Sequence, residues 1–261
     1  DAKGLASWRE EKAVIKKLAK SVFDYLGFRL IRKTRSNHKI SKELPSRNID
    51  RKIVEQIFDF FALIPPFYDS SVRDQLKIAG AWGQDLRERR KNQLELLNAR
   101  DAQGYAILLD SLLTNELVSG QWSISYFEQR LLNKAAPEEF LANLKLYENL
   151  TGDTNYGSLI DGDFGGRWGV KIGKKTLLLP DPYKGINAFN AANYLNSLTV
   201  KKHVYLDFGS GIGSDAIKVS KMVERPTRFL LCDIPLNLTT AYAYVSANVN
   251  YQCHLVSSTK Q

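Results

Sequence analysis

Hydrophobic residues recur at three- and four-residue spacing through most of the first 150 positions, with lysines and other polar residues between them. This periodicity is typical of amphipathic helices that pack by one face. The pattern predicts helices over residues 5–26, 48–61, 70–97, 101–117 and 137–150. Asn48 is the expected N-cap of the second helix. We therefore expect residues 1–150 to form an α-helical N-terminal domain.

The composition changes at Thr151, where a glycine-rich stretch begins. Seven glycines lie between 151 and 173, and Trp168, Val170 and Ile172 occupy alternate positions. Such alternation predicts a short hairpin. The segment 151–185 is expected to be a connector between two domains or, because glycine lets a backbone approach closely, a loop that wraps a ligand. Side chains suited to a hydroxylated ligand are Asp161, Asp163, Arg167 and Trp168.

A strand, a glycine turn and a helix are predicted between residues 203 and 223. Val204 to Leu206 has the pattern of a short buried strand, and helix-forming residues follow from Ser214. The glycines between them remove Cβ atoms where a backbone must pass against a ligand, and the first N–H groups of the helix add donors. Another helix is expected just before this unit, over 187–198, with Tyr194 among its inward-facing side chains.

An acidic residue stands at the end of the next apolar strand. Residues 229–232 form that strand, and Asp233 follows it. In nucleoside-binding α/β units, a carboxylate at this point binds the ribose hydroxyls. Loop, helix, strand and terminal acid thus occur in the order that a nucleoside site requires. A glycine-rich turn in an unrelated α/β unit would show part of the same pattern.

The glycine spacing separates two classes of nucleoside cofactor. A dinucleotide fingerprint would place its third glycine at position 214, where this chain has Ser214, so a nicotinamide oxidoreductase is disfavoured. From Asp207 to Gly213 the chain reads acidic-x-Gly-x-Gly-x-Gly, which resembles motif I of the class I S-adenosylmethionine-dependent methyltransferases. The resemblance implies that the loop passes beneath the methionine part of S-adenosylmethionine and that Asp207 helps to hold its amino group.

The residues from Asp233 to Pro235 make this resemblance more specific. It is similar to the acidic-x-Pro step of small-molecule O-methyltransferases, in which proline opens the next helix. Together with the helical N-terminal region and an Asn- and Tyr-rich helix over 186–198, it resembles the bacterial sugar O-methyltransferases. The resemblance implies S-adenosylmethionine as cofactor and a small-molecule or glycan acceptor that is methylated on a sugar hydroxyl. The expected cofactor-binding residues are Asp207, Gly209, Gly211, Gly213 and Asp233.

The fold class predicted from these elements is α/β. A helical N-terminal domain (1–150) and the connector (151–185) precede the first half of a Rossmann-like methyltransferase domain with a parallel sheet (186–261). Only 54 residues follow Asp207, which is enough for two strands and a third over 252–256. We therefore expect the chain to be part of a longer methyltransferase, to leave apolar sheet surface uncovered, and to bind cofactor weakly or not at all by itself.

The sequence identifies no catalytic residue and no metal site. His254 lies in the expected third strand and is expected to be structural, while His38 and His203 have no carboxylate partner that the sequence reveals. No cluster of His, Asp and Glu has metal-ligand spacing, and the distant Cys232 and Cys253 do not make a zinc site alone. So few cysteines favour a reducing, cytoplasmic location.

The charge distribution raises a second hypothesis. The net charge is +9, and residues 1–50 hold 13 Lys and Arg against 6 Asp and Glu. A solvated helix face explains this charge. The alternative is a non-catalytic binding module whose basic helical region contacts nucleic acid or an anionic membrane. We expect no nucleic-acid partner, because aromatic residues are not interleaved with the lysines. No transmembrane segment is expected, and the helical region is a candidate homo-oligomer contact.

Overall fold

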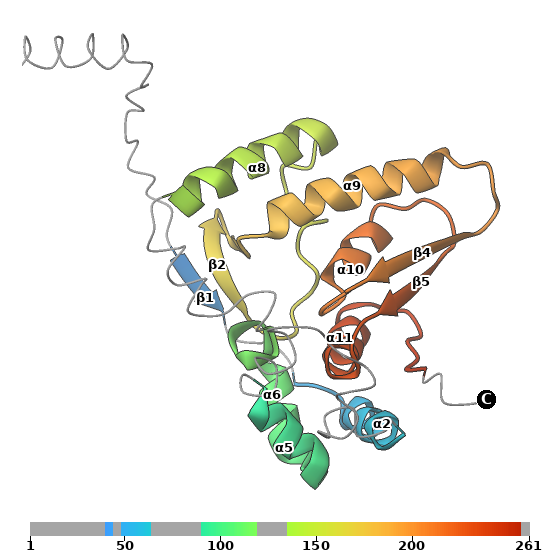
Figure 1. Cartoon of the computed structure of the whole chain (residues 1–261). Coiled ribbons are helices and arrows are strands. Elements are labelled where there is room, and N and C mark those ends of the chain that lie inside the picture. Colours follow the sequence, from blue (N-terminus) through green and yellow to red (C-terminus); the bar gives the residue numbers. More distant parts are fainter. Residues whose placement is uncertain (1–39, 44–47, 64–89, 119–134, 257–261) are drawn as a thin grey trace, which may run out of the picture. The chain divides into compact units, whose positions relative to one another are not determined.

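The computed structural model describes residues 40–43, 48–63, 90–118 and 135–256. All of them belong to one compact unit that begins at His38 (Figure 1). The expected helix over 5–26, its basic face and most of the helix expected over 70–97 lie outside these residues. The proposed domain boundaries at 150 and 185 stay predictions.

Three helices from the first half of the chain pack with the last one. They are α2 (Arg51–Ala62), α5 (Lys91–Ala99) and α6 (Ala102–Asp110), and α11 (Pro235–Asn248) completes the group. Their shared core contains Ile57, Leu97, Tyr105 and Tyr244. The predicted cap of α2 was wrong: Asp50, not Asn48, accepts the Lys52 N–H with its side chain.

The helix predicted over 101–117 ends at Asp110 and gives way to two 3-10 turns, Leu112–Thr114 and Glu116–Val118. Asn115 explains the break. Its side-chain amide donates to the Leu108 carbonyl at 2.6 Å, and its side-chain oxygen accepts the Leu117 N–H at 2.9 Å. These bonds compete with the helical pattern, as short amide side chains commonly do.

Two long helices lie side by side in the second half of the chain, α8 (Ala135–Thr151) and α9 (Asp181–Ser197). The start of α9 precedes the predicted one because Pro182 suits the first turn of a helix. Tyr194 was predicted to face inward, but 66% of its surface is exposed. Apolar residues of this region form a second core cluster of Phe140, Leu144, Tyr147, Leu159, Val170 and Leu177.

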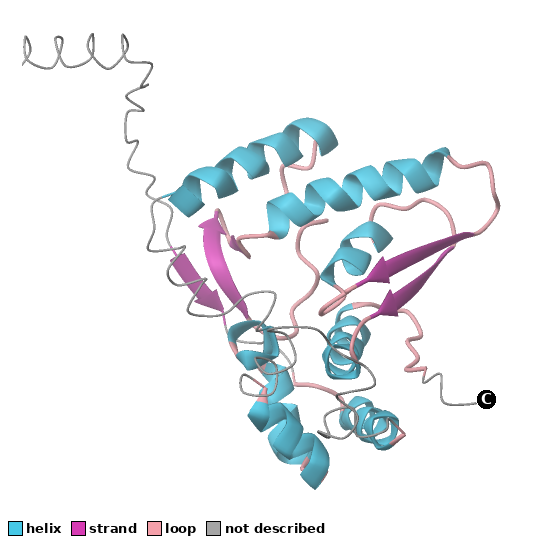
Figure 2. Cartoon of the chain, viewed as in Figure 1, coloured by secondary structure: helices cyan, strands magenta, loops and turns pink. Residues whose placement is uncertain are grey.

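The hairpin predicted from the alternating residues is confirmed as β2 (Arg167–Ile172) and β3 (Lys175–Leu177). The additional strand β1 (Ile40–Glu43) pairs with β2 to give an antiparallel sheet in the order β1-β2-β3 (Figure 2). Gly169 is required by the strand spacing, since a Cβ there would lie 1.9 Å from the Leu177 carbonyl oxygen.

A second sheet consists of two parallel strands, β4 (His203–Phe208) and β5 (Thr227–Cys232), with α10 (Ser214–Ser220) between them in sequence. Asp207 pairs with Leu231 and Phe208 with Cys232, so both strands end at the same edge. The expected α/β character is confirmed. That this unit is part of a Rossmann-like methyltransferase domain stays a prediction.

The third strand predicted over 252–256 is absent from the described chain, because those residues form no strand. Cys253 and Leu255 instead pack their side chains against the core around α11. His254 is exposed and lies outside any strand. The apolar residues of this segment are therefore used for packing on a helix rather than for pairing with β5.

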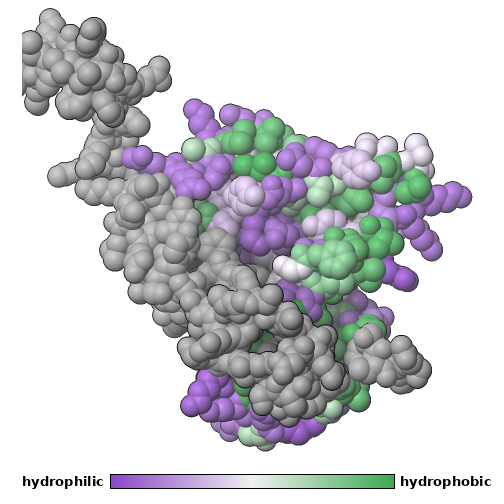
Figure 3. Space-filling view, viewed as in Figure 1, coloured by the Kyte–Doolittle hydropathy of each residue, from purple (hydrophilic) through white to green (hydrophobic). Residues whose placement is uncertain are grey.

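The two faces of the parallel strand pair have different surroundings. Tyr205 and Phe229 point to the side where α9 and α10 contribute apolar residues. The prediction of a buried strand at Val204 was wrong in this respect, because the opposite face is exposed. Exposed fractions on that face are 60% for Val204, 47% for Leu206, 76% for Phe208 and 45% for Leu230. Hydrophobic residues gather over these strands in the space-filling view (Figure 3).

A matched pair of phenylalanines tests this asymmetry. Phe208→Ala is expected to change the free energy of unfolding by less than about 0.5 kcal/mol, because its ring is already exposed. Phe140, with 2% exposure, lies in the second core cluster. Phe140→Ala is expected to cost about 3–5 kcal/mol. Urea unfolding followed by circular dichroism measures both, and equal losses would contradict the assignment of the exposed face.

Candidate functional site

The predicted glycine loop lies at the carboxyl end of β4, and its backbone requires glycine at three positions. Gly209, Gly211 and Gly213 have φ values of 71°, 58° and 78°, which side-chain-bearing residues rarely adopt. The Gly209 N–H donates to the Cys232 carbonyl at 2.7 Å, and the Gly213 N–H donates to the Ser210 carbonyl at 2.8 Å. The loop is thus a defined turn anchored on the end of β5.

Asp233 holds the middle of this loop. Its Oδ2 accepts the Gly211 N–H at 2.7 Å, and its Oδ1 accepts the Ile234 N–H at 2.7 Å and the Asn237 Nδ2–H at 2.8 Å. The structure therefore brings together two features that the sequence predicted separately, the loop and the acid after the second strand. It also gives Asp233 a role inside the chain, because the carboxylate fixes the loop backbone directly.

Asp207 ends the inner face of β4 near two other carboxylates and one lysine. Burial raises the pKa of Asp207, and Asp215 raises it further, whereas the Lys184 ammonium lowers it. Lys184 Nζ on α9 contacts Asp215 Oδ2 on α10 at 2.6 Å. Sequence reasoning did not find this pair, because the two residues are 31 positions apart and belong to no motif.

Several buried polar atoms near the loop are unsatisfied. Within the part of the chain that the structure describes, four of them have no hydrogen-bond partner: Asp207 Oδ2, Ser210 Oγ, Asp215 Oδ1 and Asn237 Oδ1. Buried polar atoms are normally paired, so their concentration here distinguishes this region from an ordinary turn. Three of these four atoms are acceptor oxygens, so the set suits a polar ligand that carries hydrogen-bond donors.

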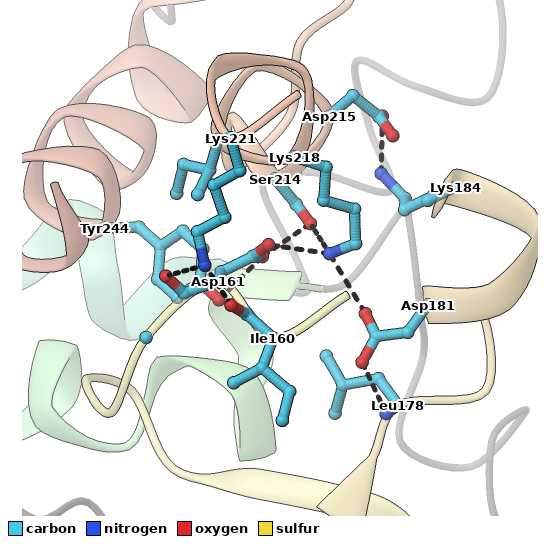
Figure 4. A network of polar contacts seen from close by, with 12 residues as sticks. Ile160, Asp161, Leu178, Asp181, Lys184, Ser214, Asp215, Lys218, Lys221 and Tyr244 are labelled. Carbon is cyan, nitrogen blue, oxygen red and sulfur yellow. Dashed lines mark hydrogen bonds and ion pairs between the residues drawn. The ribbon is translucent and has the colours of Figure 1, made fainter. Parts of the chain in front are cut away.

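Behind the loop lies a fully buried polar cluster, drawn in Figure 4. Lys218 Nζ on α10 lies 2.6 Å from Asp161 Oδ1 and 3.1 Å from Asp181 Oδ1. Asp161 Oδ2 accepts the Ser214 hydroxyl at 2.6 Å and the Tyr244 hydroxyl at 3.0 Å. The cluster therefore joins the glycine-rich segment 151–173 to the start of α9, to α10 and to α11.

The buried charges of this cluster compensate one another. Burial raises the pKa of Asp161, but the charge and hydrogen bond of Lys218, the Ser214 hydroxyl and the charge of Arg167 together outweigh this effect, and the net direction is down. Burial lowers the pKa of Lys218, while Asp161 and Asp181 raise it, and the net direction is up. The pKa of Asp181 is raised, because burial outweighs the attraction of Lys218. Asp161 and Lys218 form the charged centre of the cluster.

Arg167 adds a second positive charge beside Asp181. Its NH1 lies 3.9 Å from Asp181 Oδ2, and its NH2 donates to the Gly162 carbonyl at 2.6 Å. Asp161 and Arg167 were candidate ligand-binding groups, but both are buried and bonded within the chain. Asp163 is exposed. These observations favour the connector interpretation of the segment over the ligand-wrapping one.

No protein-family model, no curated protein and no solved structure matches the chain. Across the described ranges, no group of three or more His, Cys, Asp and Glu side chains is arranged to hold a metal ion. In the same ranges, no helix is both long and apolar enough to cross a bilayer.

The charge balance of the buried cluster is testable with Lys218→Met. Removing one partner of a buried ion pair leaves uncompensated charge, so we expect the free energy of unfolding to fall by about 3–5 kcal/mol. Without Lys218, burial raises the carboxyl pKa values in the folded state. The folded variant then gains protons as the pH falls, so its deficit is expected to be smaller at about pH 5 than at about pH 8.

Urea unfolding at both pH values measures this effect. Lys145→Met is the control, because Lys145 is an exposed lysine of α8. We expect that variant to change stability by less than about 0.5 kcal/mol at either pH. A Lys218→Met deficit that does not depend on pH would show that the two carboxylates are not the groups left uncompensated.

Alanine substitutions at two glycines of the loop test backbone strain and steric overlap separately. Gly209→Ala meets no atom within 4 Å, so only its positive φ opposes the change, at about 1–2 kcal/mol. Gly213→Ala would place its Cβ 2.6 Å from Val245 Cγ2 and 3.0 Å from Leu231 Cδ1. We expect Gly213→Ala to cost at least about 1 kcal/mol more in urea unfolding. Equal costs would contradict the close packing of the loop on α11 and β5.

Proposed function

We propose that this chain binds S-adenosylmethionine at the loop Gly209–Gly213 and at Asp233, and that it belongs to an O-methyltransferase acting on a sugar hydroxyl. The observation that carries the proposal is the left-handed glycine loop, held by Asp233 at the shared end of two parallel strands. Ligands of open α/β sheets bind at the carboxyl ends of the strands.

The shape of the loop supports a nucleoside-containing ligand. Three residues without Cβ atoms let a flat group approach the backbone closely. Among the described residues Asp233 Oδ2 has one donor, the Gly211 N–H, and a carboxylate oxygen accepts two. One acceptor position therefore remains for a ligand hydroxyl on the atom that already orients the loop.

The charge of the site supports a positively charged ligand. Asp215 and Asp233 both raise the pKa of Asp207, and among the described residues Lys184 is the cation that lowers it. Three carboxylates near one ammonium favour the sulfonium and ammonium groups of S-adenosylmethionine over the pyrophosphate of a dinucleotide. Ser214 also argues against a dinucleotide, because its hydroxyl is bonded to buried Asp161 where the fingerprint has glycine.

In methyl transfer, bound S-adenosylmethionine supplies the electrophilic methyl group. The residues of this chain bind and orient: the loop and Asp233 position the nucleoside end, and the carboxylates near Asp207 attract the charged end. Positioning alone accounts for a large part of the rate in such reactions. A sugar acceptor is proposed from the resemblance of the helix at 186–198 and the Asp233–Pro235 step to sugar O-methyltransferases.

Ligand-detected NMR tests the proposed cofactor, because it registers weak as well as tight binding. We expect signals from S-adenosylmethionine and S-adenosylhomocysteine and none from NAD. Asp233→Asn is expected to weaken S-adenosylmethionine binding by about tenfold or more, because it removes a charge and disturbs the Gly211 contact. Asp163→Asn, which changes an exposed carboxylate, is the control and is expected to bind normally.

Preferential binding of NAD, or binding unaffected by Asp233→Asn, would contradict the cofactor assignment. The acceptor is tested separately, with the full-length protein, by transfer of a labelled methyl group to a panel of free and nucleotide-linked sugars. Incorporation into sugars is expected. Label transferred only to non-sugar hydroxyls would leave the cofactor assignment standing and overturn the acceptor class.

A further inference from the structure

The first residue of α10 connects the glycine loop to the buried cluster. Ser214 follows Gly213 directly and is 3% exposed. Its hydroxyl donates to Asp161 Oδ2 at 2.6 Å, across 53 positions of sequence, and lies 3.0 Å from Lys218 Nζ. A side chain at the end of the loop is therefore attached to a charged group in the interior.

Asp161 is a fixed point for this attachment. Its Oδ1 accepts Lys218 Nζ, and its Oδ2 accepts the hydroxyls of Ser214 and Tyr244 (Figure 4). Its backbone carbonyl accepts Lys221 Nζ at 3.2 Å. Donors from α10 and α11 thus hold one carboxylate from two sides, and the carboxylate stays charged because Lys218 adjoins it.

Other contacts hold the preceding part of the loop. The Gly209 N–H is bonded to the Cys232 carbonyl, and the Gly211 N–H is bonded to Asp233. The three glycines have no side chains with which to pack, and glycine has the greatest backbone freedom of any residue. The conformation of the loop therefore depends on its hydrogen bonds and on the buried side chain of Ile212, and the Ser214 bond secures the residue that follows the loop.

From this arrangement we propose that Ser214 is a positioning residue, whose hydrogen bond to Asp161 sets the glycine loop in its cofactor-binding conformation. The proposal rests on the proposed cofactor site and deepens it. Ser214 acts on the ligand through the backbone of the loop. The dinucleotide fingerprint has glycine at this position. Here, by contrast, a side chain is needed to make the hydrogen bond to Asp161.

Two variants, each lacking one hydroxyl, distinguish positioning of the loop from general stabilisation of the fold. Ser214→Ala and Tyr244→Phe each remove one buried hydroxyl that donates to the same oxygen, Asp161 Oδ2. Both residues are almost fully buried. Only Ser214 adjoins the loop, whereas Tyr244 lies on α11. Both variants are expected to keep the fold, as checked by circular dichroism, and to lose similar amounts of thermal stability.

Two readouts distinguish the variants. In Ser214→Ala we expect amide hydrogen exchange at Gly211 and Gly213 to accelerate about tenfold, and the dissociation constant for S-adenosylmethionine to rise about tenfold. In Tyr244→Phe we expect both quantities to stay within about twofold of wild type, because that hydroxyl does not touch the loop.

Equal changes in both variants would overturn the positioning role, because the loss of a merely structural hydrogen bond would change exchange and binding to the same extent in the two variants. Failure of the full-length wild-type protein to bind S-adenosylmethionine is a different result and would overturn the proposed function. In that case hydrogen exchange still tests whether the Ser214–Asp161 hydrogen bond holds the loop. Faster exchange at Gly213 in Ser214→Ala alone supports this role, and equal exchange in the two variants refutes it.

Discussion

The structure around the candidate site depends on one buried ion cluster, in which Lys218 lies between Asp161 and Asp181. An ammonium group without any exposure has to keep its carboxylate partners, because leaving one charge unpaired costs several kcal/mol. The three residues come from the glycine-rich segment 151–173, the start of α9 and α10. This constraint therefore fixes how these three segments pack, and through α10 it fixes where the glycine loop begins its helix.

Different groups hold the end and the middle of the glycine loop. Interior charges secure the end of the loop through Ser214, while Asp233 secures its middle from the end of β5. Among the unsatisfied atoms, Ser210 Oγ belongs to the loop and Asp207 Oδ2 to the end of the strand before it. A glycine loop held in this way can present backbone and carboxylate groups to a ligand without changing its own conformation, which reduces the entropy lost on binding.

The local part of this arrangement could be predicted from the sequence, and the long-range part could not. The strand, the three glycines and Asp233 were found because strand pattern and positive φ are properties of neighbouring residues. Lys218 in an apolar stretch of helix was the only local sign of the buried cluster, whose partner Asp161 is 57 positions away. Tyr194 and the segment 252–256 were misjudged because apolar spacing does not reveal which neighbour covers a residue.

The alternation along β4 explains why the candidate site and the exposed apolar face do not coincide. Successive side chains of a strand point to opposite faces, so Asp207 shares the inner face with Tyr205, while Leu206 and Phe208 point outward. The inner face is the one that α9 and α10 approach, which is why Lys184 of α9 acts on the Asp207 carboxylate. The alternation of side chains along β4 and the helices on its inner side thus determine which charged groups lie at the site. Covering the outer face would leave these groups unchanged.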